Sequence, residues 1–264
     1  MAIPYCVVDA FTPKAFGGNP AAVCVLENPL SETLLAAIAA EFNLSETAYL
    51  IPAGENSWDL RWFTPTTEVN LCGHATLAAA WVLWQEHKIQ ADLLRFNTRS
   101  GELIATRLDA GVQLNFPLIR TEPLAASDLL QNLFPGALAF ERAGEDLLVE
   151  LVDVAVVEAL VPNLPAIAAL PYRGVGVTAA AADKHYQVVS RFFAPRFGID
   201  EDPVTGSWHC ALADYWGKKR SLEQFWARQA SGRGGLMQVS QVGERVHLWG
   251  QAVITMRGSL DLPA

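Results

Sequence analysis

The chain has 264 residues, of which 51% are hydrophobic and 18% charged, a composition that indicates a folded protein and excludes a disordered one. The formal net charge is −9, and Lys218-Lys219-Arg220 is the only short basic run, so we expect no nucleic-acid and no acidic membrane partner. The length allows one large domain or two of ordinary size.

We expect a cytoplasmic protein. The first nine residues have no basic region and reach a carboxylate too early for a signal peptide. No apolar run approaches the roughly 18 to 20 residues that span a bilayer. Four widely separated cysteines without a C-x-x-C pair indicate reduced thiols: Cys6, Cys24, Cys72 and Cys210.

The first half of the chain predicts many strands and one central helix. We expect strands at 5–9, 21–26, 48–51, 58–63, 93–96, 101–108 and 112–116, and helices at 31–43 and 74–86. Ser31 is a good N-cap for the first helix, which should end near Asn43. Between the first two strands, Gly17-Gly18 permit positive φ, and Asn19 offers a donor and an acceptor. Residues 44–47 read as a loop.

The second half predicts a similar composition of elements. We expect helices at 127–133, 161–170 and 206–217, and strands at 175–180, 186–193, 225–231, 236–242, 246–249 and 251–257. Residues 146–157 read as one long strand or a strand pair. The two prolines of 117–123 mark the domain boundary, giving an N-terminal lobe, 1–117 with the last strand at about 251–264, and a C-terminal lobe, 118–250. Regular βαβ alternation is missing, so we expect α+β lobes.

One order of residue types occurs twice. Residues 61–65 contain Arg, two aromatic residues and Pro, and they precede Gly73-His74 and an alanine-rich helix; residues 191–195 precede Gly206-Ser207 and a second helix in the same way. Two such copies predict two similar lobes, each with a helix N-terminus directed at a shared cleft. Helix N-termini carry unpaired N–H groups and partial positive charge, so that cleft should bind an anion.

Glu46 and His74 are candidates for acid–base chemistry. Apolar residues flank Glu46, and such surroundings raise a carboxyl pKa into the range of a general acid or base; the alternative is a solvated loop carboxylate. His74 begins a helix, where the dipole should keep it neutral and donating; the alternative is a capping or packing histidine. We expect no metal site, because the sequence contains no H-x-x-x-H, no H-E-x-x-H and no Cys/His cluster.

The stretch before the second central helix is the other candidate. Asp202, Thr205 and Ser207 have the residue types of ordinary helix caps. In a functional interpretation, the N–H groups of Thr205, Gly206 and Ser207 bind a substrate carboxylate, while Asp202 holds a hydroxyl or amine. Nucleotide-binding loops and a G-x-S-x-G nucleophile motif are absent from the sequence.

Five segments, in order, resemble the PhzF-like isomerase family of phenazine biosynthesis, and the match runs nearly end to end. They are 9–11 with 18–20, 44–47, 61–65, 73–76 and 201–207. The family's fold is similar to that of diaminopimelate epimerase. The resemblance therefore implies an α+β fold of two pseudo-symmetric lobes, each a strongly curved, barrel-like β-sheet around a central helix.

The resemblance also implies an activity. Glu46 would be the catalytic carboxylate, which in the best-known members moves a proton between two carbons of a dihydro-hydroxyanthranilate without cofactor or metal. The expected substrate contacts are Asn19, Gly73, His74, Asp202, Thr205, Gly206 and Ser207. A small carboxylate is the expected partner, and a homodimer is expected because dimers are common in the family.

Two alternatives stay open. The related epimerases use two cysteines; Cys72 matches the first position, but Pro203 stands at the second, and Cys210 lies too far into its helix to replace it. An epimerase or racemase would thus lack its second base. The other alternative is a non-catalytic binding protein that keeps the cleft.

Overall fold

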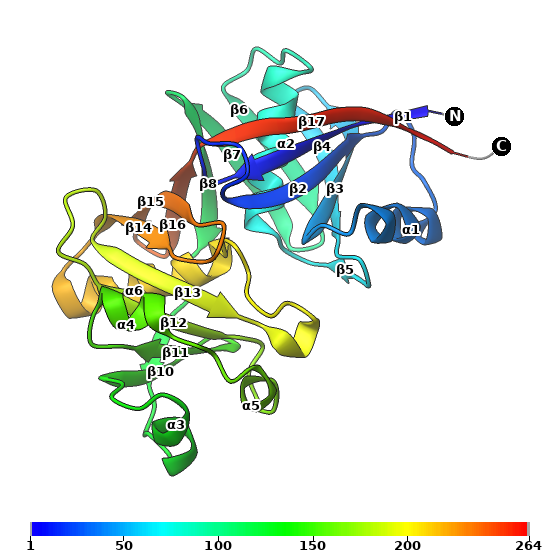
Figure 1. Ribbon diagram of the computed structural model, residues 1–264. Helices are drawn as coiled ribbons and strands as arrows, with labels where there is room; N and C mark the ends of the chain where they lie inside the picture. The colour runs from blue at the N-terminus through cyan, green and yellow to red at the C-terminus, as the bar shows by residue number, and fades with distance from the viewer. Residues whose placement is uncertain (1, 263–264) are drawn as a thin grey trace. The chain divides into compact units, whose positions relative to one another are not determined.

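The computed structural model describes residues 2–262, and by internal contacts the chain divides into two compact units (Figure 1). Unit 1 extends to Asn115 and resumes at Trp249, and unit 2 runs Phe116–Leu248. Both boundaries fall inside strands, β8 (Gly111–Pro117) and β16 (Arg245–Gly250), and not in the Pro-containing stretch 117–123. None of the helices in the described part of the chain is both long and apolar enough to cross a membrane.

The strands of unit 1 form a mixed sheet. They are β1 (Ala2–Ala10), β2 (Asn19–Val25), β3 (Glu46–Gly54), β4 (Ser57–Phe63), β5 (Glu68–Val69), β6 (Leu93–Thr98), β7 (Gly101–Leu108) and β17 (Ala252–Asp261), with the start of β8. β1 pairs antiparallel with both β2 and β17, whereas β2 with β3 and β4 with β6 are parallel. The last strand therefore pairs with the first.

A central helix, α2 (Gly73–Gln85), is buried on nearly all sides. Ten of its thirteen residues are buried, and it packs on β1, β2, β3, β7 and β17. Small alanine side chains allow this close packing, and a helix that is apolar all round belongs inside a core. The other helix, α1 (Glu32–Phe42), begins after the cap Ser31 and ends at Asn43 in the left-handed conformation, which confirms the predicted bounds.

Unit 2 repeats the combination of a mixed sheet and a buried helix. Its strands are β9 (Thr121–Pro123), β10 (Ala139–Ala143), β11 (Asp146–Glu150), β12 (Val175–Ala180), β13 (Val188–Phe193), β14 (Gln224–Gln229) and β15 (Gly235–Val242), with most of β16. Its helices are α3 (Asp128–Leu133), α4 (Val154–Ala159), α5 (Leu164–Ala168), the 3-10 helix η1 (Pro195–Phe197) and α6 (Gly206–Arg220). Ten of the fifteen residues of α6 are buried, and its last turn carries the predicted basic run Lys218-Lys219-Arg220.

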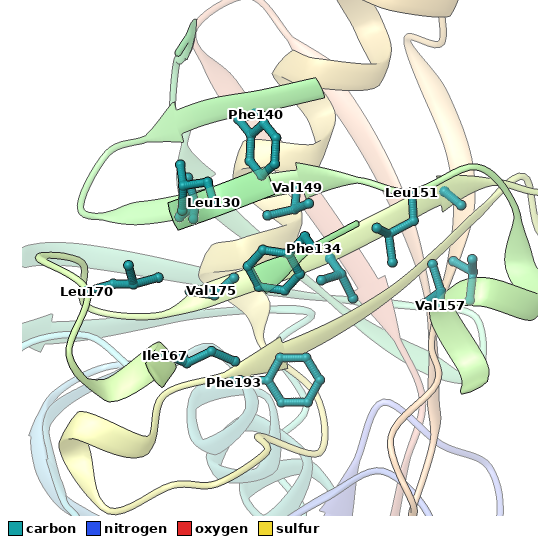
Figure 2. Close-up of a cluster of buried hydrophobic side chains, with 14 residues drawn as sticks. Leu130, Phe134, Phe140, Val149, Leu151, Val157, Ile167, Leu170, Val175 and Phe193 are labelled. Carbon is teal, nitrogen blue, oxygen red and sulfur yellow. The ribbon is translucent and has the colours of Figure 1, made fainter. Parts of the chain in front are cut away.

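The short helices of unit 2 close a second apolar core (Figure 2). Leu130 of α3, Val157 of α4 and Ile167 of α5 pack with the side chains of β10 to β13, among them Val149 and Phe193. Helices this short have little stability of their own, so burial of their apolar side chains holds them in place.

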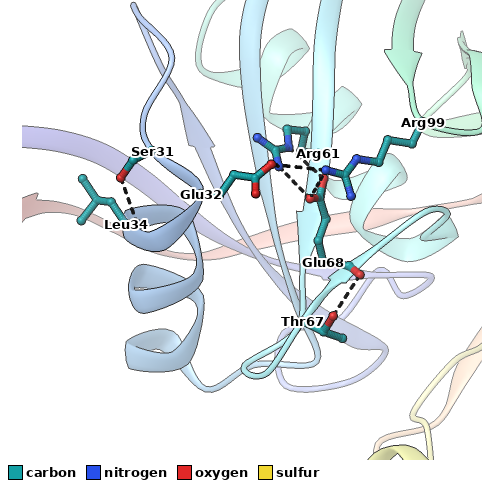
Figure 3. A network of polar contacts seen from close by, with 7 residues as sticks. All are labelled: Ser31, Glu32, Leu34, Arg61, Thr67, Glu68 and Arg99. Atoms are coloured by element: carbon teal, nitrogen blue, oxygen red, sulfur yellow. Dashed lines mark hydrogen bonds and ion pairs between the residues drawn. The ribbon is translucent and has the colours of Figure 1, made fainter.

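The arginines of the repeated sequence order make matching contacts in the two units. Arg61 forms a bidentate pair with Glu68 (2.8 and 2.6 Å), which Figure 3 shows. The Arg61 guanidinium also lies 5.1 Å from the ring centre of Phe63. Arg191 pairs in the same way with Glu201 (2.8 and 2.9 Å) and lies over Phe193. Planar guanidinium groups suit this combination of carboxylate and ring, so these arginines fix the loop that leads to each central helix.

The mixed strands and six α-helices of the described residues agree with the predicted α+β class, but several local predictions were wrong. The strand expected at 146–157 ends at Glu150, because the side chain of Asp153 accepts the N–H of Val156 and starts α4. The helix expected at 161–170 is shorter in the structure, where α5 covers only Leu164–Ala168. Glu46 lies in no loop: it is the first residue of β3. Strands β5, β9 and β10 were not predicted.

Candidate functional site

In unit 1, three predicted site residues meet at one end of the sheet. Asn19 is the first residue of β2, Glu46 is the first residue of β3, and His74 is the second residue of α2. The two strands are parallel, with Ala21 beside Glu46, so both begin at the same edge. The start of the central helix lies at this edge too, since His74 contacts both other side chains.

The loop that delivers Asn19 depends on a glycine. Gly18 has φ +60°, and a Cβ there would lie 2.1 Å from the carbonyl oxygen of Ala10. Only glycine fits this close approach. The buried carboxylate of Asp9 fixes the same loop by accepting the N–H of Phe16 at 2.7 Å. The hairpin therefore holds Asn19 in one position before β2 begins.

The three side chains form a line of hydrogen-bonding groups. Asn19 Nδ2 lies 3.1 Å from His74 Nδ1, and His74 Nε2 lies 3.2 Å from Glu46 Oε2. Nδ1 of the imidazole thus faces the amide of Asn19, and Nε2 faces the carboxylate of Glu46 in a close polar contact that lacks hydrogen-bond geometry. Asn19 is fully buried and the His74 side chain is 5% exposed, whereas that of Glu46 is 13% exposed. Glu46 is thus the member of this line that a ligand can reach most easily.

The structure corrects the expected charge preference of His74. Burial disfavours its imidazolium form, yet the neighbouring Cys72 and Glu46 hold the pKa of His74 well above its usual value. The sequence predicted a neutral histidine from the helix dipole alone, because it could not place the carboxylate opposite Nε2. Burial, reinforced by Glu46, raises the pKa of the Cys72 thiol to about 11.

The N-terminus of α2 offers backbone donors beside this line. Gly73 is its first residue, and the N-cap Cys72 makes no side-chain cap hydrogen bond. A helix start that lacks an oxygen cap suits an anionic ligand, because its first N–H groups and its dipole both favour negative charge. Gly73 therefore begins the helix whose second residue, His74, contacts Glu46.

In unit 2, the residues before α6 bond to one another and to the side chain of Gln229. Thr205 Oγ1 donates to Asp202 Oδ2 at 2.5 Å, and Thr205 N donates to the side-chain oxygen of Gln229 at 2.8 Å. Gln229 Nε2 in turn donates to the carbonyl oxygen of Asp202 at 2.8 Å. The N–H of Thr205 is thus bonded within the protein, in contrast to the expectation that it binds a substrate carboxylate. Asp202 and Thr205 shape the loop before Gly206.

Ser207, the second residue of α6, has an arginine neighbour that the sequence analysis missed. Arg173 Nη2 donates to Ser207 Oγ at 3.2 Å, and Arg173 Nε donates to the buried Asp146 at 2.9 Å. The guanidinium also lies 5.6 Å from the ring centre of Phe192. Arg173 and Gln229 come from distant parts of the chain and belong to no local motif, so only the fold reveals them.

The buried His209, one turn into α6, predicts a specific acid sensitivity. Burial lowers the pKa of His209 to about 4, while its Nδ1 bonds to the carbonyl oxygen of Thr205 at 2.8 Å. In the unfolded chain a histidine takes up its proton near pH 6.5, so between pH 6.5 and about 4 the unfolded state binds more protons. The free energy of unfolding should therefore fall by up to about 1.4 kcal/mol per pH unit as the pH drops through this window.

Urea unfolding at several pH values, comparing wild type with His209→Gln, measures this contribution. Between pH 6.5 and 4, the free energy of unfolding of the variant is expected to fall less steeply with decreasing pH than that of the wild type, whatever its absolute stability. The exposed His185, replaced in the same way, is the control and should keep the wild-type slope. Equal slopes for all three proteins would contradict the assignment.

Comparison with known proteins identifies the family. The phenazine biosynthesis-like protein family, PhzC-PhzF, matches residues 8–258. The chain belongs to this family. A protein of Halalkalibacterium halodurans named an uncharacterized isomerase is 42% identical over 99% of this chain and 100% of its own length. A Pseudomonas aeruginosa protein, also named an uncharacterized isomerase, is 44% identical over 97% of both chains.

Solved structures show the same relationship. A PhzF-family phenazine biosynthesis protein of Enterococcus faecalis superposes with a TM-score of 0.95 at 39% identity, covering 99% of this chain and 100% of that one. A hydroxyproline epimerase of Agrobacterium vitis, with bound trans-4-hydroxy-L-proline, has a TM-score of 0.63 at 13% identity, covering 98% of this chain and 92% of that one. At that identity the epimerase shows a shared fold and nothing more.

Proposed function

We propose that this PhzF-family protein is an isomerase that moves a proton between two carbons of a small carboxylate-bearing substrate, with Glu46 as the proton carrier. The line of Asn19, His74 and Glu46 supports the proposal more than any other observation. It consists of a buried amide, a buried imidazole and one carboxylate with partial exposure. Homologues that are named isomerases at 42% and 44% identity agree with it.

The roles of the three residues follow from their contacts. Glu46 accepts a proton from a carbon that a neighbouring carboxylate and unsaturation make acidic, and it returns the proton to another carbon. His74 Nε2 lies 3.2 Å from Glu46 Oε2, close enough for the imidazole to stabilise the carboxylate electrostatically between turnovers. Asn19 holds the imidazole through Nδ1 and so acts as a positioning residue, in place of the substrate contact that the sequence predicted. In this proposal no cofactor or metal takes part in the reaction.

The substrate would bind through its own carboxylate. The N–H groups at the start of α2, beside Gly73, suit this anion and lie next to His74 and Glu46. The contacts expected from Asp202, Gly206 and Ser207 remain predictions of the family resemblance. A dihydro-hydroxyanthranilate is the proposed substrate class, on the same resemblance.

Proton exchange in heavy water tests the proposal. The purified protein is incubated with a dihydro-hydroxyanthranilate or, separately, with an L-amino acid such as proline, and deuterium at carbon is followed by NMR. We expect exchange and double-bond movement with the first compound only. Exchange at the α-carbon of the amino acid, abolished by Cys72→Ala, would favour an epimerase instead. A change in tryptophan fluorescence on ligand addition without any exchange would favour a binding protein.

A further inference from the structure

Three potential metal ligands converge beside the proposed proton carrier. Glu46, Cys72 and His74 each offer one ligand atom, and these atoms all lie within 4.8 Å of one another. Cys72 Sγ is 3.6 Å from His74 Nδ1, and Glu46 Oε2 is 3.2 Å from His74 Nε2. Cys72 and His74 are buried, at 6% and 4% exposure, and no other such group occurs among residues 2–262. No metal site was expected from the sequence, because it contains no H-x-x-x-H or H-E-x-x-H motif and no Cys/His cluster; the fold brings Glu46 to Cys72 and His74 from a distant part of the chain.

The separations fit a small ion after modest side-chain rotation. Because the three ligand atoms lie within 4.8 Å of one another, an ion placed between them would be at most about 2.8 Å from each. Zinc bonds to protein ligands measure about 2.0–2.3 Å. Movements of less than about 1 Å therefore complete the coordination. The imidazole gives the ion Nε2, the nitrogen that faces Glu46, so Nδ1 carries the ring proton and donates it to the side-chain oxygen of Asn19 after that amide turns over.

We propose that Glu46, Cys72 and His74 bind a single Zn²⁺ ion, and that the ion blocks the isomerase by occupying its proton carrier. Mixed oxygen, nitrogen and sulfur ligands are the set that zinc accepts, whereas magnesium and calcium require oxygen ligands. The Cys72 thiol gives its proton to solvent as the Sγ–zinc bond forms. Three protein ligands leave a fourth position, which water or the carboxylate of a bound ligand fills.

The blocking step rests on the proposed function, but zinc binding does not. With its carboxylate bonded to a cation, Glu46 no longer accepts a proton from carbon. Binding of the metal itself can be measured without substrate. A failure of the metal proposal is therefore distinguishable from a failure of the proposed isomerase activity.

Cobalt(II) serves as the spectroscopic probe for this site. The full chain, freed of metal by a chelator, is titrated with Co²⁺ and then with Zn²⁺. The wild type is expected to bind one Co²⁺ with a thiolate-to-cobalt charge-transfer band and tetrahedral visible bands, all of which Zn²⁺ removes. Cys72→Ala is expected to lose the charge-transfer band. Glu46→Gln and His74→Gln should weaken binding by more than about a hundredfold. Even substitution of a residue that only hydrogen-bonds to a metal ligand lowers the metal affinity 10- to 100-fold.

Cys210→Ala is the matched control, since Cys210 is an equally buried thiol near the start of the other central helix. It is expected to keep the full cobalt spectrum. The proposal is overturned if the wild type shows no charge-transfer band with excess Co²⁺, or if the band persists in Cys72→Ala.

Discussion

Glu46→Gln is expected to reduce carbon–deuterium exchange by at least about 10²–10⁴-fold, the usual contribution of a positioned general acid or base. Glutamine has nearly the same shape and keeps an oxygen that can accept the Nε2–H of His74, which lies 3.2 Å from the native carboxylate. It cannot take a proton from carbon. A loss of rate with little change in KM is therefore expected, since an interaction made only in the transition state disappears.

The control for this variant is Glu41→Gln, which changes an exposed carboxylate on α1 of the same unit. It should exchange deuterium at the wild-type rate. Full activity in Glu46→Gln would exclude Glu46 as the proton carrier and return Cys72 to consideration. Circular dichroism and thermal unfolding of both variants show whether a lost rate reflects a lost fold.

Local signals predicted α1, α2, α3 and α6 to within a few residues, but they missed α4 and made α5 too long. Ser31 caps α1 as expected and Ser127 caps α3 in the same way, because a serine hydroxyl accepts an N–H three residues on regardless of tertiary structure. The first central helix begins at Gly73, one residue before its predicted start, and the second begins at Gly206 as predicted. Asp153 is also an N-cap, but the helix that it starts, α4, was predicted as a strand, because the apolar residues around Asp153 suit either structure.

The candidate site was predictable as a set of residues and not as a set of contacts. Sequence pattern and family resemblance singled out Asn19, Glu46 and His74, which the fold brings together. The hydrogen bond between Asn19 and His74 joins residues 55 positions apart, and it depends on strand register that no local signal encodes. The charge preference of His74 and the cluster with Cys72 could not be inferred for the same reason.

Trp208→Ala is expected to destabilise the protein by about 3 kcal/mol, near the lower end of the 3–5 kcal/mol for buried Trp or Phe truncations. Trp208 of α6 is fully buried, its ring centre lies 5.7 Å from that of Phe192, and its indole covers Gly176 of β12. Within the described residues its Nε1 has no hydrogen-bond partner, so truncation also removes a buried polar group that costs about 1–3 kcal/mol. The lost packing still exceeds this gain, because no other side chain can fill the space.

Guanidinium unfolding followed by circular dichroism measures this loss, with Phe197→Ala as the control. Phe197 is an aromatic residue of the same unit, 60% exposed, and its removal should change stability by no more than about 0.5 kcal/mol.

Gly176→Ala tests the packing from the opposite side, since its Cβ would lie 2.3 Å from Trp208 Cζ2. That change should destabilise the wild type by about 1–3 kcal/mol and the Trp208→Ala variant by much less, because the clash is gone. Additive losses would show that Trp208 does not fill the space above Gly176, and would remove the physical reason for a glycine at the second position of β12.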